Sequence, residues 1–168
     1  MAATVGSLSL LADPATAQQL TVHDPAGDAV DHGLDLTRIT VRNLDHKVVA
    51  KVHFVESVRG NLIISLDPRH ATGLRMVSEY RPTGHTRNLV VPGAFTDKHG
   101  GEQPAPTRCK GFTVAWSAAR PMATLSMPSR CLHRGNFGAL RFAALTEKGP
   151  DSDYAPGESG SSAWIPRG

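Results

Sequence analysis

The sequence predicts an all-β protein: an antiparallel, jelly-roll-like β-sandwich of eight or nine short strands with one disulfide bond. Apolar and polar residues alternate with a period of two along most of the chain, which is typical of strands with one buried face. Turn residues interrupt this alternation at intervals of roughly ten residues, as in sandwich folds. No stretch shows the period of a convincing helix.

Length and composition indicate one domain that is neither a disordered acidic chain nor a membrane protein. The chain has 168 residues, of which 40% are hydrophobic and 20% charged, enough to bury a core. Its formal net charge is +3, but the basic residues are scattered singly, which favours a solvated basic surface over a stripe that tracks phosphates. Aromatic residues make up only 5%, too few for a base-stacking platform. We therefore expect no nucleic-acid partner, and the apolar runs are too short for a membrane span.

The N-terminal region resembles the end of a secretory signal. An apolar stretch is followed by Ala15, Thr16 and Ala17, the small-x-small pattern that signal peptidase accepts. The preceding positive charges are missing, so we interpret residues 1–17 as the remnant of a signal peptide whose start lies upstream. The alternative is an ordinary N-terminal tail. Residues 18–168 then form the single domain of a secreted protein.

The strands follow one another in a regular order. In the first, residues 36–43, Leu36, Ile39 and Val41 point largely inward, and residues 47–55 form a hairpin with it. The other expected strands are residues 61–67, 73–80, 87–93, 111–116, 122–127, 139–145 and a short segment at 163–166. Residues 146–162 are rich in Gly, Pro, Ser and Asp, and we expect a long flexible loop there, either ligand-binding or disordered.

The two cysteines, Cys109 and Cys131, allow a single intramolecular pairing, which export would favour. They bound the expected hairpin of residues 111–127. Pairing Trp116 with Ala123 sets Cys109 near Cys131 once one bulge is allowed. The disulfide should be worth about 3 kcal/mol on the chain-entropy model. A cysteine metal site is disfavoured because neither residue has a CxxC partner.

Aspartates crowd into the segment that leads into the first expected strand. They are Asp24, Asp28, Asp31 and Asp35. Calcium takes several carboxylate oxygens, and Pro25, Gly27 and Gly33 would let this loop bring some of them together. The spacing is not that of an EF-hand. The alternative is that Asp and Gly serve only as turn residues at the start of a strand.

The segments DPAGD, DLTRITVRN, KVVAKVHF and LIISLDP follow one another between residues 24 and 68. Together they resemble the opening of the DOMON-like sandwich superfamily, which includes family 9 carbohydrate-binding modules, and of secreted actinobacterial proteins with a late cysteine pair. This resemblance implies a jelly-roll sandwich, often with a structural calcium ion. By position, the ligand candidates are Asp24, Asp28 and Asp35, with Asp67 as a further one.

Sugar-binding members of that superfamily stack a sugar ring on paired aromatic side chains. Here Tyr154 and Trp164 are the candidates for an exposed ligand platform, whereas Trp116 lies in an alternating strand and fits the core. The segment GESGSS, residues 157–162, resembles the nucleophile signature of chymotrypsin-like proteases. Too few residues follow Ser159 to complete that fold, and no histidine stands in the required context. We therefore assign no catalytic residue.

The sequence favours a secreted, non-catalytic binding or accessory module, with calcium as its candidate cofactor and an extracellular carbohydrate or protein as its partner. The alternatives are a small extracellular hydrolase acting on polysaccharide or peptide, and a protein-binding or inhibitor domain. The pairs Glu56–Glu79 and Asp151–Asp153 are expected to be exposed carboxylates unless the fold brings them together. A protein-binding domain would show an apolar patch on one sheet face.

Overall fold

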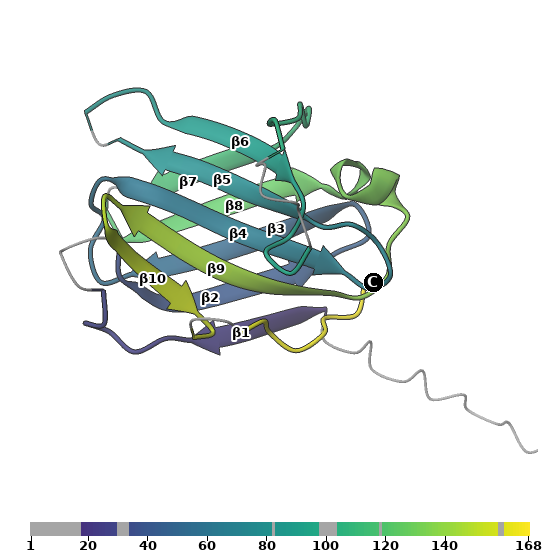
Figure 1. Ribbon diagram of the computed structural model, residues 1–168, viewed down its shortest axis with the longest axis horizontal. Coiled ribbons are helices and arrows are strands. Elements are labelled where there is room, and N and C mark those ends of the chain that lie inside the picture. Colours follow the sequence, from purple (N-terminus) through teal and green to yellow (C-terminus); the bar gives the residue numbers. More distant parts are fainter. Residues whose placement is uncertain (1–17, 30–33, 82, 98–103, 118, 158–159) are drawn as a thin grey trace, which may run out of the picture.

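The computed structural model describes residues 18–29, 34–81, 83–97, 104–117, 119–157 and 160–168. These residues form a β-sandwich of two antiparallel five-stranded sheets, seen one behind the other in Figure 1. The predicted sandwich is therefore confirmed. The described residues form ten strands rather than eight or nine, because the first and the last strand were not foreseen. No helix among them is long and apolar enough to cross a membrane.

The first sheet has the strand order β1-β2-β3-β8-β7. Its strands are β1 (Gln19–His23), β2 (Leu36–Asn43), β3 (Lys47–Phe54), β7 (Thr113–Ser117) and β8 (Met122–Pro128). Both predicted hairpins are present, since β2 pairs with β3 and β7 with β8. Trp116 lies opposite Ala123, as the alternation indicated.

The second sheet has the strand order β10-β9-β4-β5-β6. Its strands are β4 (Gly60–Pro68), β5 (Leu74–Tyr80), β6 (Arg87–Pro92), β9 (Leu140–Lys148) and β10 (Asp151–Ala155). Two short 3-10 helices, η1 (Ser129–Cys131) and η2 (His133–Gly135), follow β8. The chain passes from the first sheet to the second after β3 and again after β8, and β3 neighbours β8 while β4 neighbours β9. The chain returns to the first sheet after β6, so three crossings connect the two sheets.

The inward faces of the two sheets form the apolar core. In β4, Leu62, Ile64 and Leu66 are fully buried at alternate positions. In β2 the buried apolar residues are Leu36, Ile39 and Val41, and a bulge between Leu36 and Arg38 accounts for the irregular spacing of the first two. Each such side chain contributes roughly 1.5–3 kcal/mol when it leaves water.

An aromatic stack joins the two sheets at one end of the sandwich. The ring of Trp116 in β7 lies 4.2 Å from that of Tyr80 in β5 and 5.4 Å from that of Phe54 in β3, measured between ring centroids. Its Nε1 donates a hydrogen bond to Ser78 Oγ at 3.0 Å. Trp116 packs against the core, as predicted.

The predicted disulfide between Cys109 and Cys131 is present, with its two Cα atoms 5.7 Å apart. Cys131 ends η1, directly after β8, and Cys109 precedes β7. Both residues pack against the core. The bond therefore closes the outer hairpin of the first sheet.

The prediction of a long flexible loop at residues 146–162 is wrong for most of this range. β9 continues to Lys148, and β10 follows after a two-residue turn and pairs with it. The buried positions of β10 include Asp151 and Asp153, so an apolar alternation was not there to be recognised. The expected strand at residues 163–166 is a single bridge between Ile165 and Leu140. Residues 1–17, interpreted as a signal-peptide remnant, and residues 158–159 lie outside the described part.

Candidate metal centre

Three carboxylates converge where the edges of the two sheets meet. Asp24, Asp28 and Asp153 each offer one oxygen atom, and these atoms lie within 4.8 Å of one another. Asp24 and Asp28 follow β1, an edge strand of the first sheet, whereas Asp153 lies in β10, an edge strand of the second. Figure 1 shows these two strands along the same side of the sandwich. The cluster therefore connects the two sheets.

Asp153 is held in place by the backbone of the first sheet. Its side chain is buried, with a relative exposure of 6%, because alternate residues of β10 face the interior. Its Oδ2 accepts a hydrogen bond of 2.6 Å from the N–H of Leu36, 117 residues away in the sequence. The prediction that Asp153 is an exposed carboxylate is therefore wrong.

The loop after β1 contributes further acceptors. Asp35 Oδ2 accepts a hydrogen bond of 2.7 Å from the N–H of Gly27, which folds the loop back on itself. Gly27 has φ of +89°, a conformation that favours glycine. Asp35 Oδ1 and Asp24 Oδ2 are both buried, and neither oxygen has a hydrogen-bond partner. Two buried carboxylate oxygens are thus available to a ligand.

Burial and mutual repulsion perturb these carboxylates. Burial raises the pKa of Asp24 to about 7, and the charges of neighbouring aspartates, Asp153 foremost, add to the shift. Burial also raises the pKa of Asp153, although the hydrogen bond from Leu36 opposes this. At neutral pH the site therefore favours uptake of positive charge, either a proton or a cation.

The cluster is open to solvent. It lines a pocket of about 450 Å³, which is also lined by His23, Ser152 and Tyr154. Calcium takes six to eight oxygen ligands, some of them water. The pocket leaves room for water or a ligand to supply the oxygens that the protein does not.

Two of the three predicted metal ligands, Asp24 and Asp28, lie together in this cluster. The third, Asp35, lies beside it, since its charge contributes to the raised pKa of Asp24. Asp67 lies elsewhere, because its Oδ2 accepts hydrogen bonds from Arg141 Nε at 2.7 Å and from Thr96 Oγ1 at 2.8 Å. Asp31 lies outside the described residues. Sequence reasoning missed Asp153 as a member of this cluster, because the buried positions of β10 include two aspartates and gave no apolar alternation.

The two residues proposed as a ligand platform have different neighbours. Tyr154 in β10 lies near Phe95, with ring centroids 6.0 Å apart and a tilt of 52°, and both line a second pocket of about 250 Å³. Trp164 is 38% exposed. The guanidinium carbons of Arg69 and Arg141 lie over its ring, 4.7 and 5.1 Å from its centroid. Sequence reasoning had not foreseen these partners.

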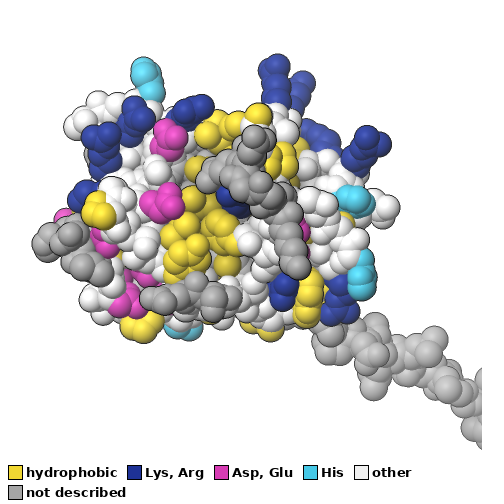
Figure 2. Space-filling model, viewed as in Figure 1, with side chains coloured by type: hydrophobic (Ala, Val, Ile, Leu, Met, Phe, Trp, Pro, Cys, Tyr) yellow, Lys and Arg dark blue, Asp and Glu magenta, His cyan; other side chains and the backbone are white. Residues whose placement is uncertain are grey.

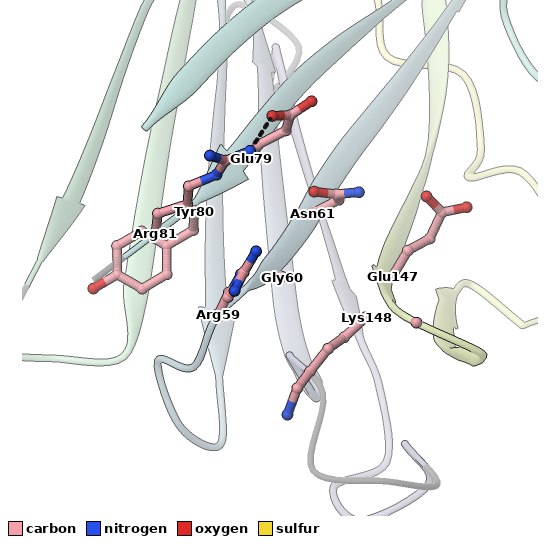
Figure 3. A pocket seen from close by; sticks show the side chains of 9 residues that line it. Arg59, Gly60, Asn61, Glu79, Tyr80, Arg81, Glu147 and Lys148 are labelled. Atoms are coloured by element: carbon pink, nitrogen blue, oxygen red, sulfur yellow. Dashed lines mark hydrogen bonds and ion pairs between the residues drawn. The ribbon is translucent and has the colours of Figure 1, made fainter. Parts of the chain in front are cut away.

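A pocket of about 440 Å³ lies at the end of the second sheet, where Tyr80 of the aromatic stack is located. Figure 3 shows Glu79, Asn61 and Glu147 on three neighbouring strands, in the register that the sheet imposes. Arg81 NH2 contacts Glu79 Oε2 at 3.4 Å. Acidic and basic groups alternate around this pocket, so it has no prevailing charge to select a ligand.

Hydrophobic side chains gather in the middle of the outer face of the second sheet, as Figure 2 shows. The register of the sheet aligns one such row across its strands: Leu89, Val77, Ile63, Leu145 and Tyr154. Polar and charged side chains surround the row. A row of this kind is a feature expected of a protein-binding surface.

Comparisons of the chain with protein-family models, with curated proteins and with solved structures found no match. The class of protein is therefore given by the fold and the site alone: a disulfide-bonded β-sandwich with a carboxylate cluster between two sheet edges. The resemblance to DOMON-like modules and the extracellular location stay predictions.

Proposed function

We propose that the protein is a secreted, non-catalytic binding or accessory module that holds a structural calcium ion through Asp24, Asp28 and Asp153, with Asp35 as a fourth ligand. One observation carries this proposal: three carboxylates from opposite ends of the chain converge between two sheets. Several carboxylates in a flexible arrangement suit calcium better than magnesium, which prefers strict octahedral geometry and retains its waters.

The role assigned to the ion is structural because of where it would lie. An ion bound there would connect the loop after β1 to β10, and so link edge strands of the two sheets. It would also neutralise carboxylates that otherwise repel one another. The disulfide supports an extracellular location, since such bonds persist mainly in oxidising compartments.

Calcium titration of chelator-treated protein tests this proposal. Calcium at a hundred times its dissociation constant should stabilise the fold by about 2.7 kcal/mol, which raises the melting temperature by about 5–10 °C. The Asp153→Asn variant should lose this response, while Asp45→Asn, an exposed aspartate in the β2–β3 turn, should keep it. An unchanged melting curve for the wild type at millimolar calcium would show that the protein holds no stabilising calcium ion.

A hydrolase is the second candidate, and the same carboxylates favour it. Asp24, whose pKa is about 7, and Asp153 line one solvent-open pocket, and such a pair can donate and accept a proton. An assay of wild type and Asp24→Asn against polysaccharide and peptide substrates separates the two functions. If the wild type hydrolyses a substrate and the Asp24→Asn variant does not, the protein is an enzyme rather than a non-catalytic binding module.

A further inference from the structure

The strands of the first sheet carry positive charge without any negative charge. All their residues are described, and none of the five strands contains an Asp or a Glu. They contain four Arg and Lys residues: Arg38, Arg42, Lys47 and Lys51. The strands of the second sheet, in contrast, contain five carboxylates: Asp67, Glu79, Glu147, Asp151 and Asp153.

The strand alternation brings all four cations to the outer face of the first sheet. The intervening residues are buried: Ile39, Val41, Val48, Ala50 and Val52. The four cationic side chains are exposed. Those of β2, and likewise those of β3, are four residues apart, which is about 13 Å along a strand. We call this surface the basic face, made of Arg38, Arg42, Lys47, Lys51, His23 and His53.

Hydroxyl groups surround these charges. In the register of the sheet, Thr21, Thr40, Lys51 and Thr124 form one row across four strands. Thr21 Oγ1 and Thr40 Oγ1 share a hydrogen bond of 2.8 Å. Further hydroxyls on this face are Thr113, Ser117 and Ser126. The two aromatic rings of these strands, Phe54 and Trp116, belong to the internal stack.

One end of the basic face is hollowed. His23, Arg38 and His53 lie opposite one another on three strands and line a shallow pocket of about 300 Å³. Arg38 NH2 donates to His53 Nε2 at 3.0 Å, which leaves Nδ1 of a neutral His53 as a donor. Burial lowers the pKa of His53, and the charges of Arg38 and Lys51 lower it further, as a positive local field requires.

None of the four Arg and Lys residues of the basic face forms an ion pair with a described residue. The ion pairs that the described residues form join Arg81 and Arg87 to Glu79, and Arg141 to Asp67, all on the second sheet or in its loops. The cations of the first sheet are thus free to meet an external anion. Fixed charges of one sign on an open surface attract ligands of the opposite sign.

We propose that the basic face binds a linear anionic polysaccharide that carries carboxylate or sulfate groups. The cations would contact the anionic groups, and the threonine and serine hydroxyls would bond to sugar hydroxyls. The outward positions of these strands carry no Phe, Tyr or Trp, so they offer no base-stacking platform for a single-stranded nucleic acid. The apolar side chains on this face include Val49 and Met122, which lie opposite Arg42 and His53 rather than in an apolar patch suited to membrane insertion. His23 lies at the border of the basic face and the candidate metal centre, but none of the four Arg and Lys residues lines the pocket of that centre. This proposal therefore extends the proposed function, and either can fail alone.

Binding of the full chain to polygalacturonate and to dextran sulfate, with neutral dextran as control, tests the proposal. A chelator should be present throughout, so that calcium neither bridges the protein to the polymer nor stabilises the protein. The wild type should bind both anionic polymers at low salt and lose them at high salt, because salt screens exposed charges. The polymer that binds more tightly indicates whether the face prefers carboxylate groups, as in polygalacturonate, or sulfate groups, as in dextran sulfate.

Two charge-matched double variants locate the binding surface. Arg42→Thr with Lys51→Thr removes two charges from the basic face and keeps strand-forming residues. Arg81→Thr with Arg87→Thr removes two from the second sheet. The first should bind about tenfold more weakly and the second about as well as the wild type. Melting curves confirm that both variants are folded.

Several outcomes would overturn the proposal. Failure of the folded wild type to bind either polymer at low salt is one, and equal weakening of both double variants is another, since it would indicate net charge rather than this face. Tighter binding to duplex DNA or to anionic phospholipid vesicles than to both polymers would assign the face to a different partner.

Discussion

The carboxylate of Asp153 contacts two segments of the chain, and its substitutions separate two effects. Its Oδ2 satisfies the buried N–H of Leu36, while its charge repels Asp24. Asn keeps a hydrogen-bond acceptor and removes the charge, whereas Ala removes both. The pair of variants therefore distinguishes hydrogen bonding from electrostatics.

Asp153→Ala should lower the free energy of unfolding by about 1–3 kcal/mol, because the Leu36 N–H would be left buried without an acceptor. Asp153→Asn in calcium-free protein should be as stable as the wild type or more so. Urea denaturation at neutral pH measures both. If both variants lose the same free energy of unfolding, the hydrogen bond to Leu36 is not the cause of the destabilisation.

The stability of calcium-free protein should fall as the pH rises through the window between 3.8 and about 7. In that window the folded state holds a proton on Asp24 that the unfolded state has released, so folding is favoured at the acid side and the advantage is lost toward pH 7. The raised pKa of Asp153 acts in the same direction. Melting curves recorded with a chelator check the sign, and stability that rises across the window would contradict it.

At the scale of elements, the strands with apolar buried positions were predictable and the others were not. β2, β3 and β4 begin and end within one residue of the ranges expected from their alternation. β10 alternates as regularly, but its buried positions include Asp151 and Asp153, so the pattern resembled a polar loop. β1 is a short edge strand with only Leu20 and Val22 as inward residues.

The candidate metal centre, like the set of strands, was predictable only in part from the sequence. Asp24 and Asp28 are close in the sequence, so their clustering was visible there. Asp153 joins them only because β1 and β10 are edge strands on the same side of the sandwich. That meeting depends on how the two sheets stack, which no local pattern encodes.

The aromatic stack makes a prediction about β7 and β5. Trp116→Phe should cost about 1 kcal/mol by losing the hydrogen bond from Nε1 to Ser78 Oγ. Ser78→Ala should cost more, because it also removes the hydrogen bond that Ser78 Oγ donates to Asn88 Oδ1. The double variant should lose less than the sum, because both changes remove the same interaction. Urea denaturation of the four proteins measures the coupling, and strict additivity would show that the bond contributes nothing.

For the molecule as a whole, the disulfide and the proposed ion lie at opposite edges of the first sheet. The disulfide closes the β7–β8 hairpin, and the carboxylate cluster adjoins β1. Three strands lie between β1 and β7, which sets these edges about 19 Å apart. Each device restrains an edge that the other does not reach.

Their contributions should therefore add. Replacing both cysteines with Ser should cost about 3 kcal/mol. In saturating calcium, the further loss on Asp153→Asn should match its loss in the disulfide-bonded protein within about 0.5 kcal/mol. Calorimetry or urea denaturation of the single and combined variants measures this. A combined loss well below the sum would indicate that the two edges unfold together before the rest.

The position of Asp153 also bears on the order in which the protein can assemble. The loop after β1 leaves the ribosome early, but the carboxylate that completes the cluster is that of Asp153, which lies 117 residues after its hydrogen-bond partner Leu36. Contacts of such long sequence separation form slowly, because most of the chain must be ordered first. A partly made chain would have the acidic loop without the strand that completes the cluster. The proposed calcium ion would therefore stabilise only molecules in which β10 has docked against the first sheet.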